Sequence, residues 1–196
     1  KATRKLYPDG FEAYGADALR FTLAAMAAAG RDIKLSVKRV EGYRNFGTKL
    51  WNVASFALMN ECRTRPDFDP ASCSQSVNQW AISEAVKATK QVTESIEKYR
   101  FNDAADAIYK FAWNSYAAWY IELIKPIMNG SDEAAKIETK AAAGWILDQI
   151  LKLLHPFMPF ITEELWAQTS DTRETNLILA EWPNLPDSLI NSDAND

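Results

Sequence analysis

Apolar residues recur at helical spacing along most of the chain. Over residues 37–61 they fall mostly three or four positions apart, which places them on one side of a helix. The apolar positions of this helix are Val40, Tyr43, Phe46, Leu50, Ala54, Ala57 and Leu58. The same kind of spacing predicts further helices over residues 16–29, 76–99, 102–125, 131–154 and 159–168. The predicted fold class is therefore all-α, a helical bundle of four or five long helices.

Capping residues mark the predicted helix ends. The predicted N-caps are Ser36, Ser76, Asn102 and Ser131. Ser76 and Gln79 are spaced as a capping box, in which the two side chains satisfy each other's backbone donors. Gly30 is expected to end the first helix in a left-handed conformation. Pro126 is expected to stop the helix that begins near residue 102, because proline lacks a backbone N–H.

The two ends of the chain are more polar than its centre. Residues 1–14 form a polar lead-in segment, residues 15–168 the helical bundle, and residues 169–196 a C-terminal extension. Within the extension, Leu177–Leu179 is predicted to be a brief extended piece, and the residues after Pro183 are predicted to be a polar tail.

Composition limits the classes of protein that fit. Hydrophobic residues make up 47% of the chain and aromatic residues 12%, which is enough to bury a core. No run of eighteen apolar residues occurs, so no membrane span is predicted. Two sparse cysteines, Cys62 and Cys73, fit a reducing cytoplasm. With a single histidine, neither a Cys–His zinc site nor a two-iron bundle site can be built, so no metal ligand is predicted.

The sequence offers no catalytic machinery of its own. His155 has no Ser or Cys partner and is interpreted as a helix-end residue that donates to a backbone carbonyl. Glu163 and Glu164 are interpreted as serving the N-terminal dipole of the last helix. There is no glycine-rich phosphate loop and no dinucleotide fingerprint. No catalytic residue and no cofactor is therefore predicted for this chain.

Charge is distributed unevenly. The chain has a formal net charge of −4, which argues against broad nonspecific binding of nucleic acid. Residues 31–49, however, hold six basic and two acidic residues, a local net charge of +4. A basic island on an acidic body can be an electrostatic footprint for phosphate.

One helix face within 37–61 combines three chemistries. Lys49, Asn52 and Phe56 are three and four positions apart and so share a side of the helix. A cation, an amide and a ring together suit unstacked single-stranded RNA bases. The alternative is an ordinary solvated face with Phe56 packed against the next helix. Most aromatic residues fit core packing, and those less easily placed in one buried stripe are Trp51, Phe56, Trp113 and Trp119.

An ordered set of short motifs resembles the valyl-tRNA synthetase family of class I aminoacyl-tRNA synthetases. Tyr14–Phe21 is similar to the segment that follows the catalytic domain in the class I synthetases for large aliphatic amino acids. The further matching strings are Gly30–Ile33, Lys38–Phe46, Lys49–Asn52, Arg100–Asn102, the aromatic run Trp113–Tyr120 with Glu122, Lys125–Pro126 and Leu154–Trp166. Each string is only moderately specific, but together they cover roughly residues 8–183 in the family's order. The resemblance implies that the chain is the anticodon-binding domain, and that residues 1–14 lead in from the catalytic domain.

The resemblance also implies roles for individual residues. Lys49, Asn52 and Phe56 would contact anticodon bases. Trp119 would do so as well, from the general region of a base-stacking aromatic on a later helix. The phosphate contacts implied for the tRNA backbone are Lys38, Arg39 and Arg44.

The parent enzyme implied by the resemblance ligates valine to its tRNA, using ATP and magnesium. The His-Ile-Gly-His and Lys-Met-Ser-Lys-Ser motifs of that enzyme, its editing domain and its coiled-coil arm are absent here, so this chain alone is expected to be inactive. The expected partners are a valine-specific tRNA and the catalytic domain of the same full-length chain, in a cytoplasmic monomer.

Two alternatives remain at this point. The same module could come from an isoleucyl- or leucyl-tRNA synthetase, although the pattern from Gly30 to Asn52 favours the valyl family. A helical protein-interaction scaffold without an RNA role would also fit the acidic total charge and the many aromatic residues.

Overall fold

A computed structural model describes residues 7–8, 10–28, 34–170 and 173–191, and these residues contain helices and no strand. The α-helices are α2 (Ala16–Met26), α3 (Val37–Met59), α4 (Ser76–Glu97), α5 (Phe101–Lys110), α6 (Ile121–Met128), α7 (Glu133–Leu154) and α8 (Pro159–Thr169). A π-helical segment, η2 (Phe111–Tyr120), joins α5 to α6, and short 3-10 turns are η1 (Pro70–Ser72), η3 (Leu177–Leu179) and η4 (Asp187–Leu189). The predicted all-α fold class is confirmed.

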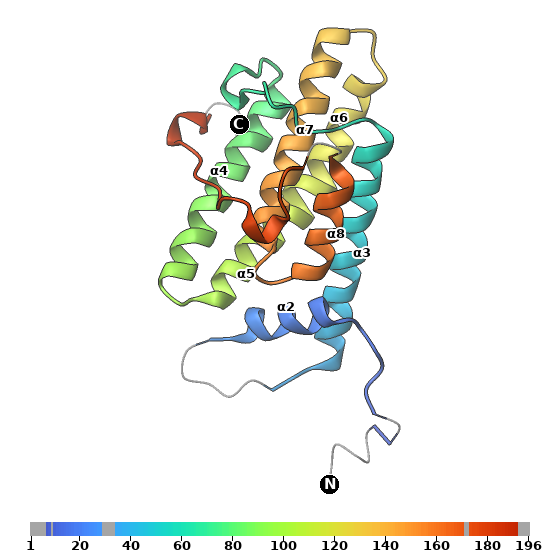
Figure 1. Ribbon diagram of the computed structural model, residues 1–196, viewed down its shortest axis with the longest axis vertical. Helices are drawn as coiled ribbons and strands as arrows, with labels where there is room; N and C mark the ends of the chain where they lie inside the picture. The colour runs from blue at the N-terminus through green and yellow to red at the C-terminus, as the bar shows by residue number, and fades with distance from the viewer. Residues whose placement is uncertain (1–6, 9, 29–33, 171–172, 192–196) are drawn as a thin grey trace.

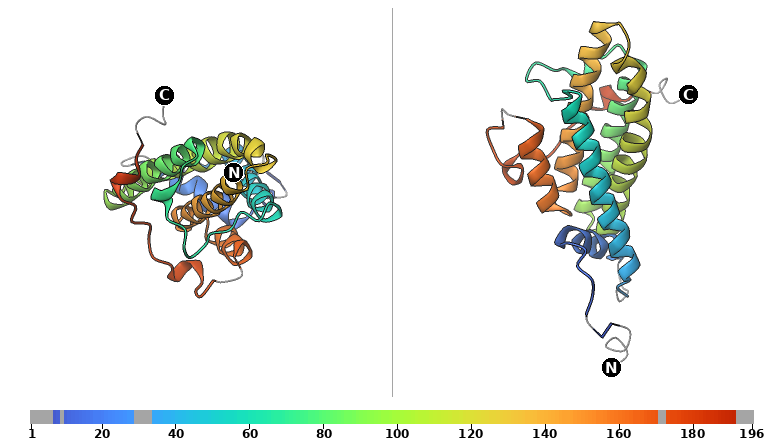
Figure 2. Two further views of the ribbon diagram at one scale, coloured as in Figure 1. Left: turned by 90° about the horizontal axis from the view of Figure 1, so that it is seen from above. Right: turned by 90° about the vertical axis from the view of Figure 1, so that its right-hand side faces the viewer.

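The long helices run side by side along the longest axis of the molecule (Figure 1). These are α3, α4, α7 and the continuous rod formed by α5, η2 and α6. The shorter α2 crosses one end of the bundle, and α8 lies beside α3. Seen from above, α7 lies between α4, the α5–η2–α6 rod, α3 and α8 (Figure 2), and it contacts all of them. The bundle is therefore organised around α7.

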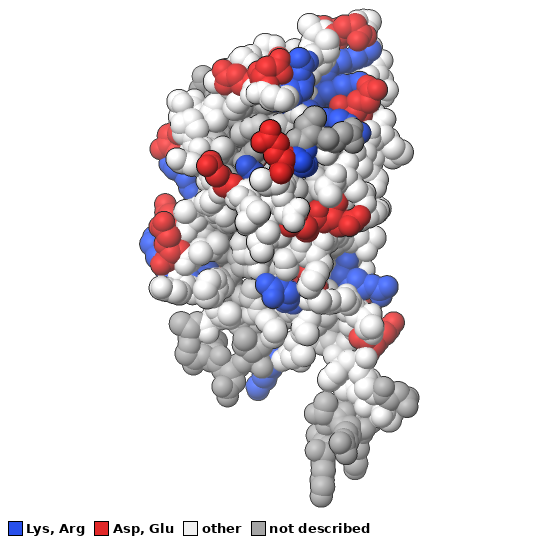
Figure 3. All heavy atoms as spheres, viewed as in Figure 1, with Lys and Arg blue, Asp and Glu red and all other residues white. Residues whose placement is uncertain are grey.

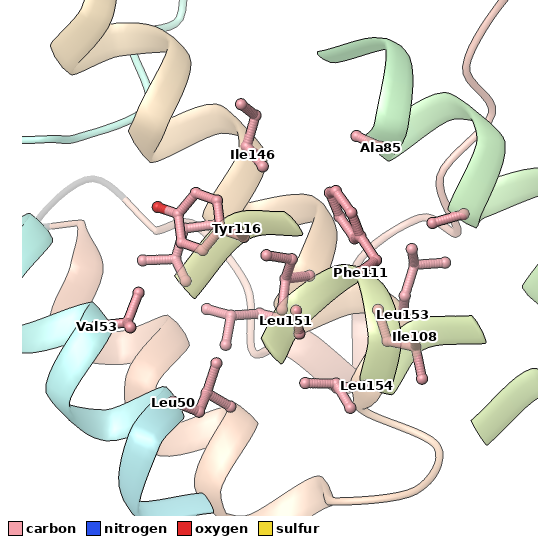
Figure 4. Close-up of a cluster of buried hydrophobic side chains, with 14 of the residues drawn as sticks. Leu50, Val53, Ala85, Ile108, Phe111, Tyr116, Ile146, Leu151, Leu153 and Leu154 are labelled. Carbon is pink, nitrogen blue, oxygen red and sulfur yellow. The ribbon is translucent and has the colours of Figure 1, made fainter. Parts of the chain in front are cut away.

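Apolar side chains on the central helix form the middle of the core. Ile146, Leu147 and Ile150 are almost completely buried, as are Leu151 and Leu154. They meet side chains from α3, α4 and the α5–η2–α6 rod, which Figure 4 shows converging on one cluster. Truncating such a leucine to alanine typically costs about 2–5 kcal/mol, so this cluster holds the surrounding helices in place.

Gly144 lets a loop pass directly against α7. A Cβ atom at Gly144 would lie 2.4 Å from the carbonyl carbon of Arg63, too close for any side chain. The loop that follows α3 is therefore laid on α7 through backbone contact, and this fixes where α3 ends relative to the core.

The N-terminus of α4 is capped from a neighbouring helix, which corrects the predicted capping box. Ser76 is the first residue of α4, and the N-cap Gln75 makes no side-chain hydrogen bond there. Instead, the Glu138 carboxylate on α7 accepts hydrogen bonds of 2.9 Å from the backbone N–H groups of Ser74 and Gln75. Gln79 donates to a loop carbonyl. The carboxylate of Glu138 thus does what Ser76 and Gln79 were predicted to do at the start of α4.

Other predicted helix boundaries are also corrected. Asn102 lies inside α5 and does not cap it. Asp132, not Ser131, caps α7, since its carboxylate accepts a backbone N–H at 3.0 Å. Pro126 lies inside α6 and does not stop it at once; its missing N–H costs one backbone hydrogen bond, and the helix ends two residues later at Met128. Ser36 is the N-cap of α3 as predicted, but its side chain makes no capping bond.

The first helix is shorter than predicted. α2 ends at Met26, not at Ala29, and the backbone N–H of Ala27 bonds to Ala24. Gly30, the predicted cap, lies outside the described residues.

The described part of the C-terminal extension, residues 173–191, packs on the bundle, which corrects the prediction of a polar tail over those residues (Figure 1). The Trp182 indole donates to the Thr93 hydroxyl of α4 at 2.9 Å, and Asp187 forms an ion pair with Lys90 of the same helix. Leu177–Leu179 is a 3-10 turn and not an extended piece. The extension therefore covers part of α4.

A largely buried ion pair ties the residues after α8 to α7. The Arg173 guanidinium donates to both carboxylate oxygens of Asp148, at 2.9 and 2.5 Å, and also covers the Trp166 ring at 3.5 Å. The Thr64 hydroxyl donates to the same carboxylate at 2.6 Å. Asp148 therefore joins the loop after α3 and the segment after α8 to the central helix.

His155 and Glu163 also differ from their predicted roles. The Nδ1 atom of His155 lies 2.9 Å from the Thr162 hydroxyl and not against a backbone carbonyl. Burial lowers the pKa of His155, which favours the neutral imidazole. The Glu163 carboxylate accepts the backbone N–H of Leu177 at 2.7 Å, so it holds η3 and does not serve its own helix end.

Candidate functional site

The face of α3 that turns away from the core lies between two neighbouring elements. In the right-hand view of Figure 2, α8 lies on one side of α3 and the α5–η2–α6 rod on the other. Phe46, Leu50 and Ala57 are buried on the inner side of the helix. The outward side of the helix, which includes Lys49, Asn52 and Phe56, is called the α3 face.

Lys49 lies against the rod with its ammonium over an aromatic ring. Its Nζ atom is 4.0 Å from the centre of the Trp113 indole and 3.4 Å from the Trp113 carbonyl oxygen. Partial burial lowers the pKa of Lys49 from its ordinary value, because burial disfavours the charged form. The ring and the carbonyl dipole hold the ammonium at the edge of the α3 face.

The Trp113 ring is itself fixed by its neighbours. It stacks on the Tyr109 ring, with the ring centres 5.7 Å apart and the planes inclined by 13°, and it also contacts Phe46. Its segment η2 is π-helical, a wide and rare turn that occurs often at functional sites. The sequence singled out Trp113 only as an aromatic residue that was hard to place, since its contact with Lys49 depends on helix packing.

Asn52 lies one turn further along α3 and is exposed. Among the described residues, its amide has no hydrogen-bond partner. An amide presents both a donor and an acceptor, which is the complement of a base edge. Asn52 is thus available to a ligand from solvent.

Phe56 completes the predicted triad and is half-buried. One part of its ring packs against the core, while the Nζ atom of Lys125 on α6 lies 6.0 Å from the ring centre. Lys49, Asn52 and Phe56 all lie within α3, so their spacing places them along one side of it, as predicted. The structure therefore brings a cation, an amide and a partly open ring together on the α3 face.

Trp119 stands apart from this arrangement. It lies in η2 and is 63% exposed, but the indole that contacts Lys49 is that of Trp113. Trp51 on α3, 40% exposed, lines an open groove of about 680 Å³ toward α8 together with Arg44 and Phe160. Exposed rings thus flank the α3 face on both sides.

The first half of α3 carries the predicted phosphate contacts. Lys38, Arg39 and Arg44 are exposed, and none of them forms an ion pair with another described residue. Arg31, part of the same basic island, lies outside the described residues. Elsewhere, acidic and basic side chains are interspersed over the face drawn in Figure 3, without a large field of one sign. Lys38, Arg39 and Arg44 therefore place three positive charges without a counter-charge among the described residues on the first half of α3.

The described residues hold no group of three or more His, Cys, Asp or Glu side chains that could bind a metal ion. In the same residues, no helix has the length and apolar character that a membrane crossing requires. Burial raises the pKa of the Cys62 thiol to about 11 and that of the Cys73 thiol to about 12. Both thiols are thus held in the unreactive protonated form.

Comparison with known proteins places the chain in a family. Curated relatives include a valine–tRNA ligase of Bradyrhizobium diazoefficiens, 61% identical over 88% of this chain and 18% of the relative. Another, from Caulobacter vibrioides, is 56% identical over 92% of this chain and 20% of the relative. The chain thus spans about one fifth of the length of these relatives.

A solved structure shares the fold at low sequence identity. It is the LeuRS of Agrobacterium radiobacter K84, from a ternary complex with tRNA and LeuAMS, which matches with a TM-score of 0.70 at 20% identity over 91% of this chain and 21% of that one. The family model described as "Anticodon-binding domain of tRNA ligase" matches residues 78–196, more than half of the chain. The chain belongs to this family of anticodon-binding domains of tRNA ligases.

Proposed function

We propose that this chain binds the anticodon stem and loop of a valine tRNA and serves as the recognition module of a valine–tRNA ligase. The observation that carries the proposal is the α3 face, where Lys49, Asn52 and Phe56 offer charge, an amide and a ring side by side. The names of the relatives, at 56–61% identity, favour valine over isoleucine or leucine.

Each residue of the α3 face has a distinct role in this proposal. Phe56 stacks an unstacked loop base, Asn52 pairs with a base edge, and Lys49 donates to a base or phosphate oxygen. Trp119 is a further base contact on the neighbouring rod. Lys38, Arg39 and Arg44 hold the phosphates of the stem, which gives affinity without sequence information.

The rest of the function depends on the full-length enzyme. We propose that the catalytic domain of the full-length enzyme ligates valine to the tRNA with ATP and magnesium. The 196-residue chain alone is expected to have no such activity. Residues 1–14 would lead in from that catalytic domain. A cytoplasmic monomer fits the proposal, since the tRNA substrate is found there.

The decisive experiment is Asn52→Ala in the full-length valine–tRNA ligase. Loss of a base-reading amide should lower kcat/KM for charging of valine tRNA by about 5- to 150-fold, as one good base contact contributes about 1–3 kcal/mol. Asn184→Ala, an exposed asparagine of the C-terminal extension, is the matched control and should leave charging unchanged. Unchanged charging by the Asn52→Ala enzyme would contradict the site assignment.

Binding of the 196-residue chain to an anticodon hairpin separates this proposal from a protein-interaction scaffold. The proposed module binds the hairpin with an affinity that falls steeply as salt rises, because phosphate contacts release counterions. A scaffold shows neither affinity nor a steep slope. Charging of valine, isoleucine and leucine tRNAs by the full-length enzyme shows to which of the three ligases the module belongs.

A further inference from the structure

The Phe56 ring is approached by a cation from a second element. Phe56 lies on α3, whereas Lys125 lies on α6, at the far end of the rod from α5. The Lys125 Nζ atom is 6.0 Å from the centre of the ring. A ring on one helix and an ammonium on the next therefore frame a position that neither helix could form alone.

Glu122 holds the Lys125 ammonium in place without burying it. Both Glu122 carboxylate oxygens accept hydrogen bonds of 2.7 Å from Nζ. The two side chains are 44% and 60% exposed, so this ion pair is a surface pair that contributes about 0–1 kcal/mol. An incoming phosphate can replace Glu122 at the ammonium at little energetic cost.

Position distinguishes Lys125 from other lysines that are paired in the same way. Lys136 on α7 also pairs with a glutamate three residues earlier at 2.7 Å, but among the described residues its ammonium makes no cation–π contact with an aromatic ring. The contact with Phe56 places Lys125 beside the ring on which a base would stack.

We propose that Phe56 and Lys125 form one nucleotide subsite, in which the base stacks on the ring while the phosphate of the same nucleotide binds the ammonium. The inference rests on the proposed function and adds Lys125, on α6, as an RNA contact. Base and phosphate of one nucleotide are joined through a single sugar, which suits a cation lying close to the ring. An ammonium is a compact point charge with three donors and binds phosphate in this manner.

The test measures binding of the 196-residue chain to an anticodon hairpin over increasing potassium chloride. Lys125→Ala should weaken binding about threefold to tenfold at low salt and reduce the slope of log K against log salt by about 0.7, the value for one phosphate on a single strand. Lys136→Ala, the matched control, should change neither quantity. Lys125→Arg keeps the charge and should retain the slope.

Modified hairpins identify the nucleotide. A methylphosphonate replaces one phosphate by an uncharged group, and it can be placed at each loop position in turn. At one position only, it should abolish the difference in hairpin affinity between the wild-type chain and Lys125→Ala. An abasic nucleotide at that position should likewise abolish the effect of Phe56→Leu. If the wild-type chain binds the hairpin but Lys125→Ala keeps its slope, the subsite is wrong and the proposed function stands. If the wild-type chain does not bind at all, the proposed function fails, and the subsite with it.

Discussion

α7 and α3 are helices of similar length, with 22 and 23 residues, but they direct their polar side chains in opposite ways. On α7, the carboxylates of Glu138 and Asp148 accept hydrogen bonds from segments that are distant in sequence. On α3, Lys38 and Arg39 reach solvent and form no ion pair with any described residue. A charge that is satisfied inside the protein organises the fold, whereas a charge that is left open is available to a partner.

The polar side chains of α7 and α3 should also differ in how much they contribute to the free energy of unfolding. A buried charge without its partner is costly, so Asp148 of α7, which is only 7% exposed, should contribute strongly to stability through its partner Arg173. An exposed cation contributes little to stability, so the cations of α3 can be replaced without loss of the fold. Substitutions on the two helices should therefore separate stability from binding.

The largest effect is expected when the Asp148 ion pair is broken. Arg173→Ala leaves a carboxylate that is only 7% exposed without its guanidinium, which should lower the free energy of unfolding by about 3–5 kcal/mol. Urea denaturation measures this loss. Arg65→Ala removes an exposed pair with Asp67 and should lower stability by less than about 1 kcal/mol. Equal losses of unfolding free energy in the two variants would show that the buried pair stabilises the fold no more than the exposed pair does.

Glu138→Gln should have a smaller effect on stability. Its charge-assisted hydrogen bonds to the N-terminus of α4 become neutral ones, so the free energy of unfolding should fall by about 1–2 kcal/mol. Glu133→Gln, at an exposed position of the same helix, is the control.

The pH dependence of the Glu138 contribution has a defined sign. Burial raises the pKa of Glu138, but the hydrogen bonds that it accepts from Ser74, Gln75 and Asn78 together outweigh burial and hold the pKa below its ordinary value of 4.5. Its contribution is therefore complete above pH 4.5 and is lost as the pH falls through the lowered pKa. The wild-type chain and Glu138→Gln should converge in acid, and a constant difference in stability would contradict this account.

The same contrast explains what could be predicted from the sequence. The helices followed from apolar spacing, because every long helix buries one side against α7. The placement of Lys49, Asn52 and Phe56 on one side of α3 followed from the same periodicity. That these residues contact RNA stays a prediction.

Contacts between distant segments could not be predicted in this way. Ser76 and Gln79 have the spacing of a capping box, but Glu138 takes that role from a helix more than fifty positions further along the chain. The pairing of Lys49 with Trp113 depends on the packing of α3 against η2, whose π-helical turns shift side chains away from α-helical spacing. Residue spacing within a helix identifies which side chains share a face, but not which distant segment packs against that face.

On α3, substitutions should change binding and leave stability nearly unchanged. Lys38→Ala and Arg39→Ala should each reduce the salt slope of hairpin binding by about 0.7–0.9 and weaken binding several-fold at low salt, with little sequence dependence. Lys90→Ala is the control, since Lys90 pairs with Asp187 on the opposite part of the bundle. Salt slopes that match the wild-type value would remove these two residues from the proposed phosphate contacts.

The smallest effect concerns the protonation of Lys49. Burial beside Trp113 lowers its pKa from the ordinary value of 10.5, so in the isolated chain its ammonium should lose the proton at a lower pH than an exposed lysine. Bound RNA places negative charge nearby, which favours the ammonium and should raise that pKa again. Titration of the Lys49 side chain by NMR, with and without the hairpin, measures both shifts. A pKa that stays the same when the hairpin binds would mean that Lys49 keeps its contact with Trp113 and does not meet the RNA, which would leave Asn52 and Phe56 as the base contacts of α3.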